Sequence, residues 1–171
     1  AHMDAANVDL KGFSDAFYRQ LTGARLEVVL DTLRYLVAET DVWVEITTLI
    51  IPGHNDDDAQ VAEQCDWIVR HLGPDVPLHF SAFHPDFKML DIPRTPVQTL
   101  RRARNIAHQT GLHHVYCGNV HDVDSDTTRC ATAALNLHRD GWHLVESLAY
   151  ERATSSEGLH QAGYFLVQAG L

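Results

Sequence analysis

The side chains of Asp9 and Lys11, which are two residues apart, could together hold a small charged ligand. They lie at the end of an apolar run from Ala6 to Leu10 that predicts a strand, where residues two apart point to the same side. A carboxylate and an ammonium placed in this way could bind the amino and carboxylate groups of an amino-acid-like molecule. A surface ion pair is the alternative that the spacing leaves open.

A second pair of candidates, Glu45 and Thr47, lies within a run rich in β-branched residues from Val42 to Ile51. This run predicts a buried strand that ends at Pro52-Gly53. Alternation puts both side chains on one face, which in a barrel is the interior. A buried glutamate needs a partner or a ligand, so pairing with Lys11 or an arginine and a role in binding substrate both stay open.

Polar residues also follow two later predicted strands. His84 comes after the strand expected from Pro77 to Ala82, and Asn119 ends the turn after the strand expected from Leu112 to Tyr116. The carboxyl ends of parallel strands meet at one edge of a sheet, where chemistry gathers. There the imidazole of His84 could stack on a bound ring or form a hydrogen bond with it, although an ordinary loop histidine fits as well.

Twelve histidines make a metal hydrolase worth testing, but their spacing does not favour it. Neither His-x-x-x-His nor Cys-x-x-Cys occurs, and His113 and His114 are adjacent in a predicted strand, which would turn their rings to opposite faces. A hydrolase based on histidine and aspartate is kept only as a less favoured alternative. Cys117 and Cys130 are interpreted as buried or incidental thiols, and Cys65 is expected on the apolar face of a helix.

Between these strands the sequence predicts three helices. The first spans Ala24 to Ala38 with an apolar face, the second follows an acidic cap at Asn55–Asp58 and stops at Gly73, and the third runs to Gly111. For the third helix Thr95 is expected to be the cap, with Pro96 in the first turn and Gln98 completing a capping box. Strands alternating with helices predict an α/β protein with parallel strands.

The chain is expected to divide after residue 122. Residues 4–122 form the α/β part, and residues 123–171 form a small appendage with a β-hairpin predicted over Leu135–Tyr150. Residues 1–3 resemble a cloning remnant, so that native sequence is expected to begin at Met3 or Asp4.

The net charge of −10 argues against a grip on nucleic acid phosphates. The three cysteines lack disulfide-like spacing, and no apolar stretch could span a bilayer or serve as a signal peptide. These features predict a cytoplasmic protein.

Several segments, in this order, resemble the radical S-adenosylmethionine (SAM) enzymes that activate glycyl radical enzymes such as pyruvate formate-lyase. The resemblance is strongest to the AmmeMemoRadiSam-system subgroup and covers roughly residues 4–130. The matching segments are Val8–Lys11, Tyr18–Gly23, Trp43–Glu45, Ile51–Asp56, Phe80–Pro85 and Tyr116–Val120.

The resemblance implies the C-terminal half of a partial βα barrel of the TIM type. It also implies reductive cleavage of SAM at a four-iron, four-sulfur cluster, which yields a 5′-deoxyadenosyl radical for hydrogen abstraction. Asp9 and Lys11 would lie beside SAM and His84 beside its adenosyl part. Thr47 stands where the activating enzymes use an arginine, and Glu45 and Asn119 would lie at the mouth of the barrel.

The sequence departs from this family at the cluster loop, because Cys-x-x-x-Cys-x-x-Cys is absent and three thiolates must hold such a cluster. The second cysteine of a knuckle in the subgroup is also replaced, within Thr127–Ala134. We therefore expect no cluster in this chain, little activity from it alone, and a radical SAM parent protein of which it is a fragment.

An open sheet edge predicts a homodimer, and the parent enzyme is expected to act on a protein partner or a small molecule. The alternative from another class is a non-catalytic half barrel that serves as a binding or dimerisation module.

Overall fold

A computed structural model describes residues 3–121, 128–129 and 136–138. The chain separates into two compact units, Ala1–Ser125 and Asp126–Leu171, which are described separately below. The first unit contains the four-stranded sheet and the long helices, and all the predicted site residues belong to it.

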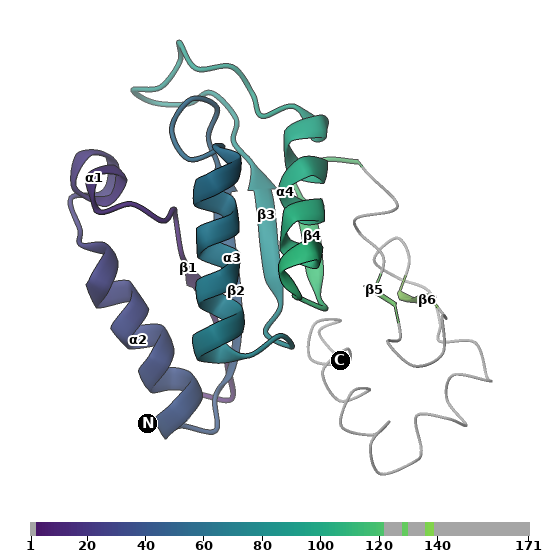
Figure 1. The fold of residues 1–171 in the computed structure, drawn as a ribbon. Helices are drawn as coiled ribbons and strands as arrows, with labels where there is room; N and C mark the ends of the chain where they lie inside the picture. Colours follow the sequence, from purple (N-terminus) through teal and green to yellow (C-terminus); the bar gives the residue numbers. More distant parts are fainter. Residues whose placement is uncertain (1–2, 122–127, 130–135, 139–171) are drawn as a thin grey trace. The chain divides into compact units, whose positions relative to one another are not determined.

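The sheet of the first unit is entirely parallel, with strand order β1-β2-β3-β4. Sequential neighbours in a parallel sheet need a crossover, and a helical segment supplies each one here (Figure 1). The predicted α/β architecture is therefore confirmed. The strands are β1 (Ala5–Asp9), β2 (Trp43–Ile50), β3 (Leu78–Ala82) and β4 (Val115–Gly118).

Three long helices lie on one face of this sheet (Figure 1). They are α2 (Leu26–Glu39), α3 (Asp58–Leu72) and α4 (Val97–Thr110), close to the predicted spans. A short helix, α1 (Asp15–Phe17), and a π-helical turn, η1 (Tyr18–Thr22), connect β1 to α2. Ser14 caps α1 by accepting a hydrogen bond from the Phe17 N–H (3.0 Å).

The core fills the space between the helices and the sheet. Along β2 the side chains of Val44, Ile46, Thr48 and Ile50 are buried, while the residues between them are half-buried. The buried set faces α3, because Thr48 contacts Gln64 of that helix. Glu45 and Thr47 therefore share the opposite face, as the alternation predicts.

The acidic run before α3 acts as a helix cap. The carboxylate of Asp57 accepts hydrogen bonds from the N–H groups of Ala59 (3.0 Å) and Gln60 (3.1 Å). This arrangement satisfies donors that lack partners within the helix. The interpretation of the run as a cap is confirmed.

The predicted cap of α4 is wrong. The cap residue is Pro96, and no side chain caps this helix. Thr95 is buried and serves the sheet: its hydroxyl donates to the Ile50 carbonyl (2.5 Å) and accepts from the Phe83 N–H (2.9 Å). Buried backbone groups at the ends of two strands need a partner more than a helix end does.

In the second unit, β5 (Thr128–Arg129) pairs antiparallel with β6 (Asn136–His138). The hairpin predicted over Leu135–Tyr150 lies largely outside the described residues, as does the Cys130 segment. Among the helices that the structure describes, none is long and apolar enough to cross a membrane.

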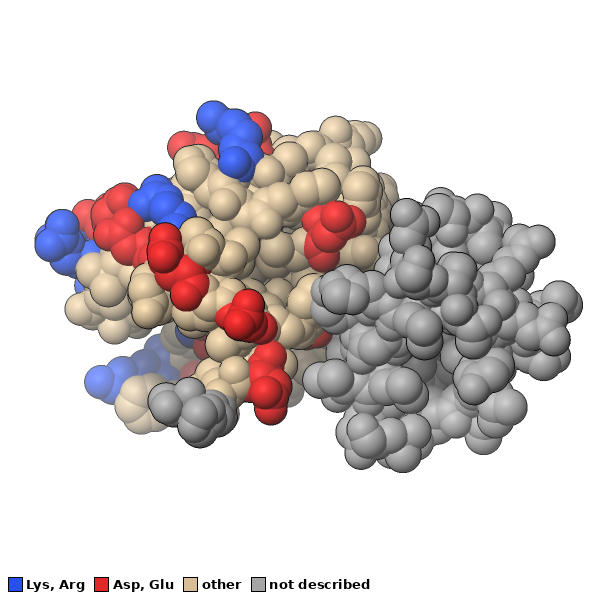
Figure 2. Space-filling model, turned by 90° about the horizontal axis from the view of Figure 1, so that it is seen from below, with Lys and Arg blue, Asp and Glu red and all other residues tan. Residues whose placement is uncertain are grey.

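Figure 2 views the molecule from the edge where the parallel strands begin. Acidic side chains are spread over the described surface in this view, and the lysine and arginine side chains seen in it form no stripe that could follow a phosphate backbone. This distribution agrees with the net charge of −10.

Candidate functional site at the carboxyl edge of the sheet

Asp9 and Lys11 lie where β1 ends and form an ion pair, with 2.8 Å between Lys11 Nζ and Asp9 Oδ2. Their side chains are 54% and 40% exposed, so a ligand can reach both charges. The predicted same-side placement is confirmed. Such an exposed pair contributes little to stability. The two charged groups can therefore separate at little cost when a ligand binds.

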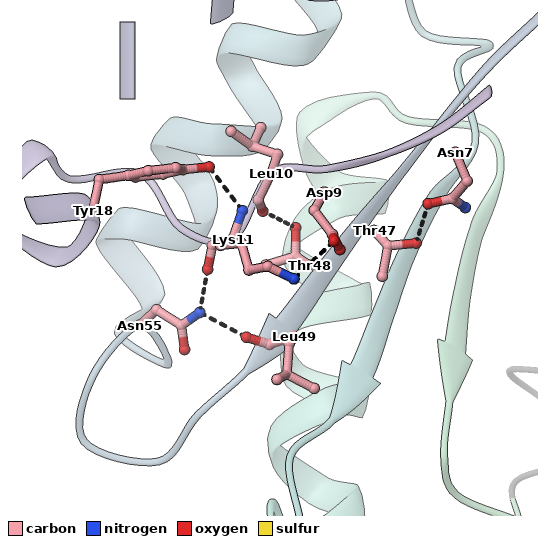
Figure 3. A network of polar contacts seen from close by, with 9 residues as sticks. All are labelled: Asn7, Asp9, Leu10, Lys11, Tyr18, Thr47, Thr48, Leu49 and Asn55. Carbon is pink, nitrogen blue, oxygen red and sulfur yellow. Dashed lines mark hydrogen bonds and ion pairs between the residues drawn. The ribbon is translucent and has the colours of Figure 1, made fainter. Parts of the chain in front are cut away.

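The backbone of Leu10 and Lys11 is held by hydrogen bonds with two elements, η1 and β2 (Figure 3). The Lys11 N–H donates to the Tyr18 hydroxyl (3.0 Å), and the Leu10 N–H donates to the Thr47 carbonyl (3.0 Å). The Thr48 hydroxyl donates to the Leu10 carbonyl (2.8 Å). Lys11 therefore starts from a fixed main chain although it lies beyond the strand.

Asn55, in the turn after β2, also holds this backbone (Figure 3). We call the hydrogen bonds of its side chain the clamp. Its amide nitrogen donates to the carbonyls of Lys11 (2.7 Å) and Leu49 (2.8 Å), and its oxygen accepts from the Ile51 N–H (2.7 Å). Asn55 is 3% exposed. The Pro-Gly-x-Asn-Asp turn thus joins the ends of β1 and β2.

The Tyr18 side chain supports the same backbone segment through its hydrogen bond with the Lys11 N–H. Burial raises the pKa of its phenol, the hydrogen bond from the Lys11 N–H opposes this, and the Asp9 carboxylate adds to the increase. The phenol therefore stays neutral at physiological pH and keeps its hydrogen bond with the Lys11 N–H.

Thr47 lies beside Asp9 in the register of β1 and β2. Its hydroxyl donates to Asn7 Oδ1 (2.8 Å), which ties the two strands together on the face away from the helices. Thr47 carries no charge, so it cannot replace an arginine as an ion-pair partner.

Glu45 contacts two residues of the sheet, Trp43 and His79. Its Oε1 accepts from the Trp43 indole (3.1 Å), and its Oε2 lies 3.0 Å from His79 Nε2. His79 thus takes the place of Lys11, the partner that the sequence left open. Sheet order explains this, because β3 brings His79 alongside β2, whereas Lys11 lies beyond the end of β1 and is engaged by Asp9.

His84 and Asn119 come together in a cleft of about 590 Å³ beyond β3 and β4. Asn119 donates to the Ala82 carbonyl (3.2 Å) and adopts a left-handed conformation (φ 61°), which asparagine tolerates. Arg94 Nη2 donates to the Asn119 carbonyl (2.5 Å). The cleft is lined by Ala82, His84, Arg94, Asn119, Val120 and His121.

Sequence reasoning missed some of these residues. Arg94 and His121 line the cleft, and His79 binds Glu45, but none of them lies in a motif that indicates such a role. Tyr18 and Asn55 belong to the motifs that carry the resemblance, but these motifs did not indicate that both side chains bind the Lys11 main chain.

The histidine pair before β4 differs from its prediction. His113 and His114 precede the strand, and both approach Asp75, with ring nitrogens 2.7 Å and 4.0 Å from its Oδ1. Even so, no group of three or more His, Cys, Asp or Glu in the described part of the chain could hold a metal ion. Nothing in that part supports the hydrolase alternative.

The described cysteines do not fit an iron–sulfur cluster. Cys65 and Cys117 are both buried, and burial raises the pKa of the Cys65 thiol to about 12. A cluster ligand must be a thiolate, and three are needed. The interpretation of Cys117 as a buried thiol is confirmed, as is the place of Cys65 on the apolar face of a helix.

Two solved structures share this fold. A domain of pyruvate-formate lyase-activating enzyme from Bacteroides vulgatus aligns with a TM-score of 0.58 and 18% identity, over 68% of each chain. A radical SAM methyltransferase from Sphaerobacter thermophilus aligns with a TM-score of 0.56 and 20% identity, over 69% of this chain and 34% of the other. The described α/β unit thus has the partial-barrel fold of radical SAM enzyme domains.

At the level of sequence, the chain is 44% identical over 128 residues to an uncharacterized protein of Methanocaldococcus jannaschii. The match covers 75% of this chain and 38% of that relative. No family model matches the chain.

Proposed function

We propose that this chain is the SAM-binding part of a radical SAM enzyme. The observation that carries the proposal is the Asp9–Lys11 pair, which is exposed, fixed by its backbone and located at the carboxyl edge of a sheet with this fold. In such enzymes, reductive cleavage of SAM supplies a 5′-deoxyadenosyl radical for hydrogen abstraction. The type that activates pyruvate formate-lyase is the form we favour.

The residues of this edge match the groups of SAM chemically. Asp9 would accept hydrogen bonds from the amino group, and Lys11 would pair with the carboxylate, each giving up its present partner. His84 would lie beside the adenosyl part of SAM, and Asn119 would lie at the mouth of the barrel. Thr47 would lie between the two ends of SAM. Glu45 is engaged by Trp43 and His79, so we assign it no contact with SAM.

We further propose that the cluster is held by residues outside this chain. The described thiols do not fit it, and the chain spans 38% of the length of the curated relative that it matches. The 171 residues alone would then bind SAM without cleaving it. Anaerobic reconstitution of this chain with stoichiometric iron and sulfide, followed by formation of 5′-deoxyadenosine, would contradict this proposal.

Calorimetric titration of the chain with SAM tests the binding role. Lys11→Ala and Asp9→Ala should each weaken binding about tenfold or more, as expected when a charge-assisted hydrogen bond is lost. The matched control is Arg19→Ala, which removes another exposed ion pair, with Asp15 (2.6 Å), and should leave the affinity unchanged. No binding by the unaltered chain, or equal loss in the control, would overturn the proposal.

We also propose a homodimer through a sheet edge. Within the described residues β1 and β4 are the outer strands of the sheet, and an uncovered edge offers backbone groups to another chain. Light scattering coupled to size exclusion should give twice the mass of one chain. A monodisperse monomer at high concentration would contradict this proposal.

A further inference from the structure

Polar side chains from three strands meet on the sheet face opposite the long helices. His79 of β3 lies between Glu45 of β2 and Tyr116 of β4. The register pairs His79 with Tyr116, and their rings stack with centroids 5.1 Å apart. In a βα barrel this face points to the interior.

Glu45 holds His79 in a defined orientation. Its side chain is 14% exposed, and a carboxylate so shielded from water needs hydrogen-bond partners. The Trp43 indole provides one at Oε1, and His79 Nε2 provides the other at Oε2. The stack on Tyr116 restricts the ring from its side.

This contact determines which ring nitrogen is available. When Nε2 donates to a carboxylate, the neutral imidazole keeps its lone pair on Nδ1. The contacts of four other described histidines run through Nδ1 instead: His71, His84, His108 and His113. His79 therefore presents the opposite nitrogen, on a side chain that is 25% exposed.

We propose that His79 Nδ1 binds a hydrogen-bond donor of the substrate, a hydroxyl or ammonium group, and that Glu45 is its positioning residue. The groups that the register brings to this face around His79 are Glu45 from β2, Tyr116 from β4 and Asp9 from β1, and each carries an oxygen that can accept a hydrogen bond. Lys11, the cation on this side, is paired with Asp9. The assignment of this face to substrate rests on the proposed function.

The first test reads the tautomer directly. Two-bond nitrogen–proton spectra of the chain should show neutral His79 with its proton on Nε2 and neutral His113 with its proton on Nδ1. Glu45→Gln should give a mixture of tautomers at His79, because an amide can accept or donate, and should leave His113 unchanged. An Nδ1–H tautomer at His79 in the unaltered chain would overturn the inference.

The second test uses small probes, with binding followed at the His79 ring signals or, in variants, at Tyr116. Ethanolamine and ethylene glycol donate hydrogen bonds, whereas 1,2-dimethoxyethane can only accept them. His79→Phe keeps the stack and should weaken donor binding about fivefold, as expected for one lost hydrogen bond. His113→Phe is the matched control and should change nothing.

The probes also distinguish an ammonium donor from a hydroxyl donor. Tighter binding of ethanolamine than of ethylene glycol assigns an ammonium group, and the reverse order assigns a hydroxyl. Equal binding of dimethoxyethane, or unchanged donor binding in His79→Phe, would overturn this inference alone. Failure of the unaltered chain to bind SAM would overturn the proposed function and leave the tautomer result intact.

Discussion

The Asn55 side chain holds the Lys11 carbonyl at 2.7 Å across 44 residues of sequence. Through the same amide it holds the Leu49 carbonyl, so one buried side chain joins the ends of two neighbouring strands. The position of the Lys11 ammonium thus depends on a residue that would not touch a ligand itself.

Asn55→Ala should lower the free energy of unfolding by about 3 kcal/mol, since the three hydrogen bonds of this buried side chain are lost at about 1 kcal/mol each. Urea denaturation measures this change. Asp56→Ala is the matched control, because that side chain caps only an exposed Gly53 N–H (2.8 Å) and should have a much smaller effect. A change below about 0.5 kcal/mol in Asn55→Ala would mean that the clamp is not formed.

Thr48→Val should destabilise the chain by about 2 kcal/mol while preserving the shape of the side chain. The hydroxyl, which is 1% exposed, links the Leu10 carbonyl to the Gln64 amide (2.6 Å). Its loss leaves both buried groups without this partner. Thr32→Val, at an exposed hydroxyl that donates to the Val28 carbonyl, controls for the substitution itself. Equal stability of the two variants in urea would contradict the prediction.

Cys65 should resist alkylation in the folded chain. Burial raises its pKa to about 12, so at pH 8 almost no thiolate is present and the thiol is also inaccessible. Iodoacetamide labelling mapped by mass spectrometry should modify Cys65 at least a hundredfold more slowly in buffer than in 8 M urea. Comparable rates in both conditions would show that the packing of α3 does not shield this thiol.

His114 should make stability depend on pH below neutrality. Burial lowers its pKa from the ordinary value of 6.5; the Asp75 carboxylate opposes this, and His113 and His108 add to the decrease. The folded state therefore favours the neutral ring, and this stability is present above pH 6.5 and is lost as the pH falls through the lowered pKa.

Denaturant midpoints between pH 7 and pH 5 measure this effect. His114→Gln should show a shallower loss of stability than the unaltered chain over this range. His54→Gln replaces an exposed histidine that is not among the causes of this shift, and it serves as the control. Parallel curves for the unaltered chain and His114→Gln would contradict the prediction.

The sequence alone determined the order and type of the main elements. The alternation in β2 and the apolar spacing in α2 and α3 are local periods that any strand or helix packed on a core must have. They can therefore be recognised in the sequence without knowledge of the fold. The same logic correctly placed Asp9 and Lys11 on one side of the chain and Asp57 at the start of a helix.

Only the tertiary structure decided which distant groups meet. Glu45 finds His79 at a separation of 34 residues because β3 lies beside β2, and no local pattern encodes that neighbour. Thr95 leaves its expected cap because Ile50 and Phe83 offer buried backbone groups nearby. Such contacts follow from sheet order and register, which arise only when the whole sheet has packed.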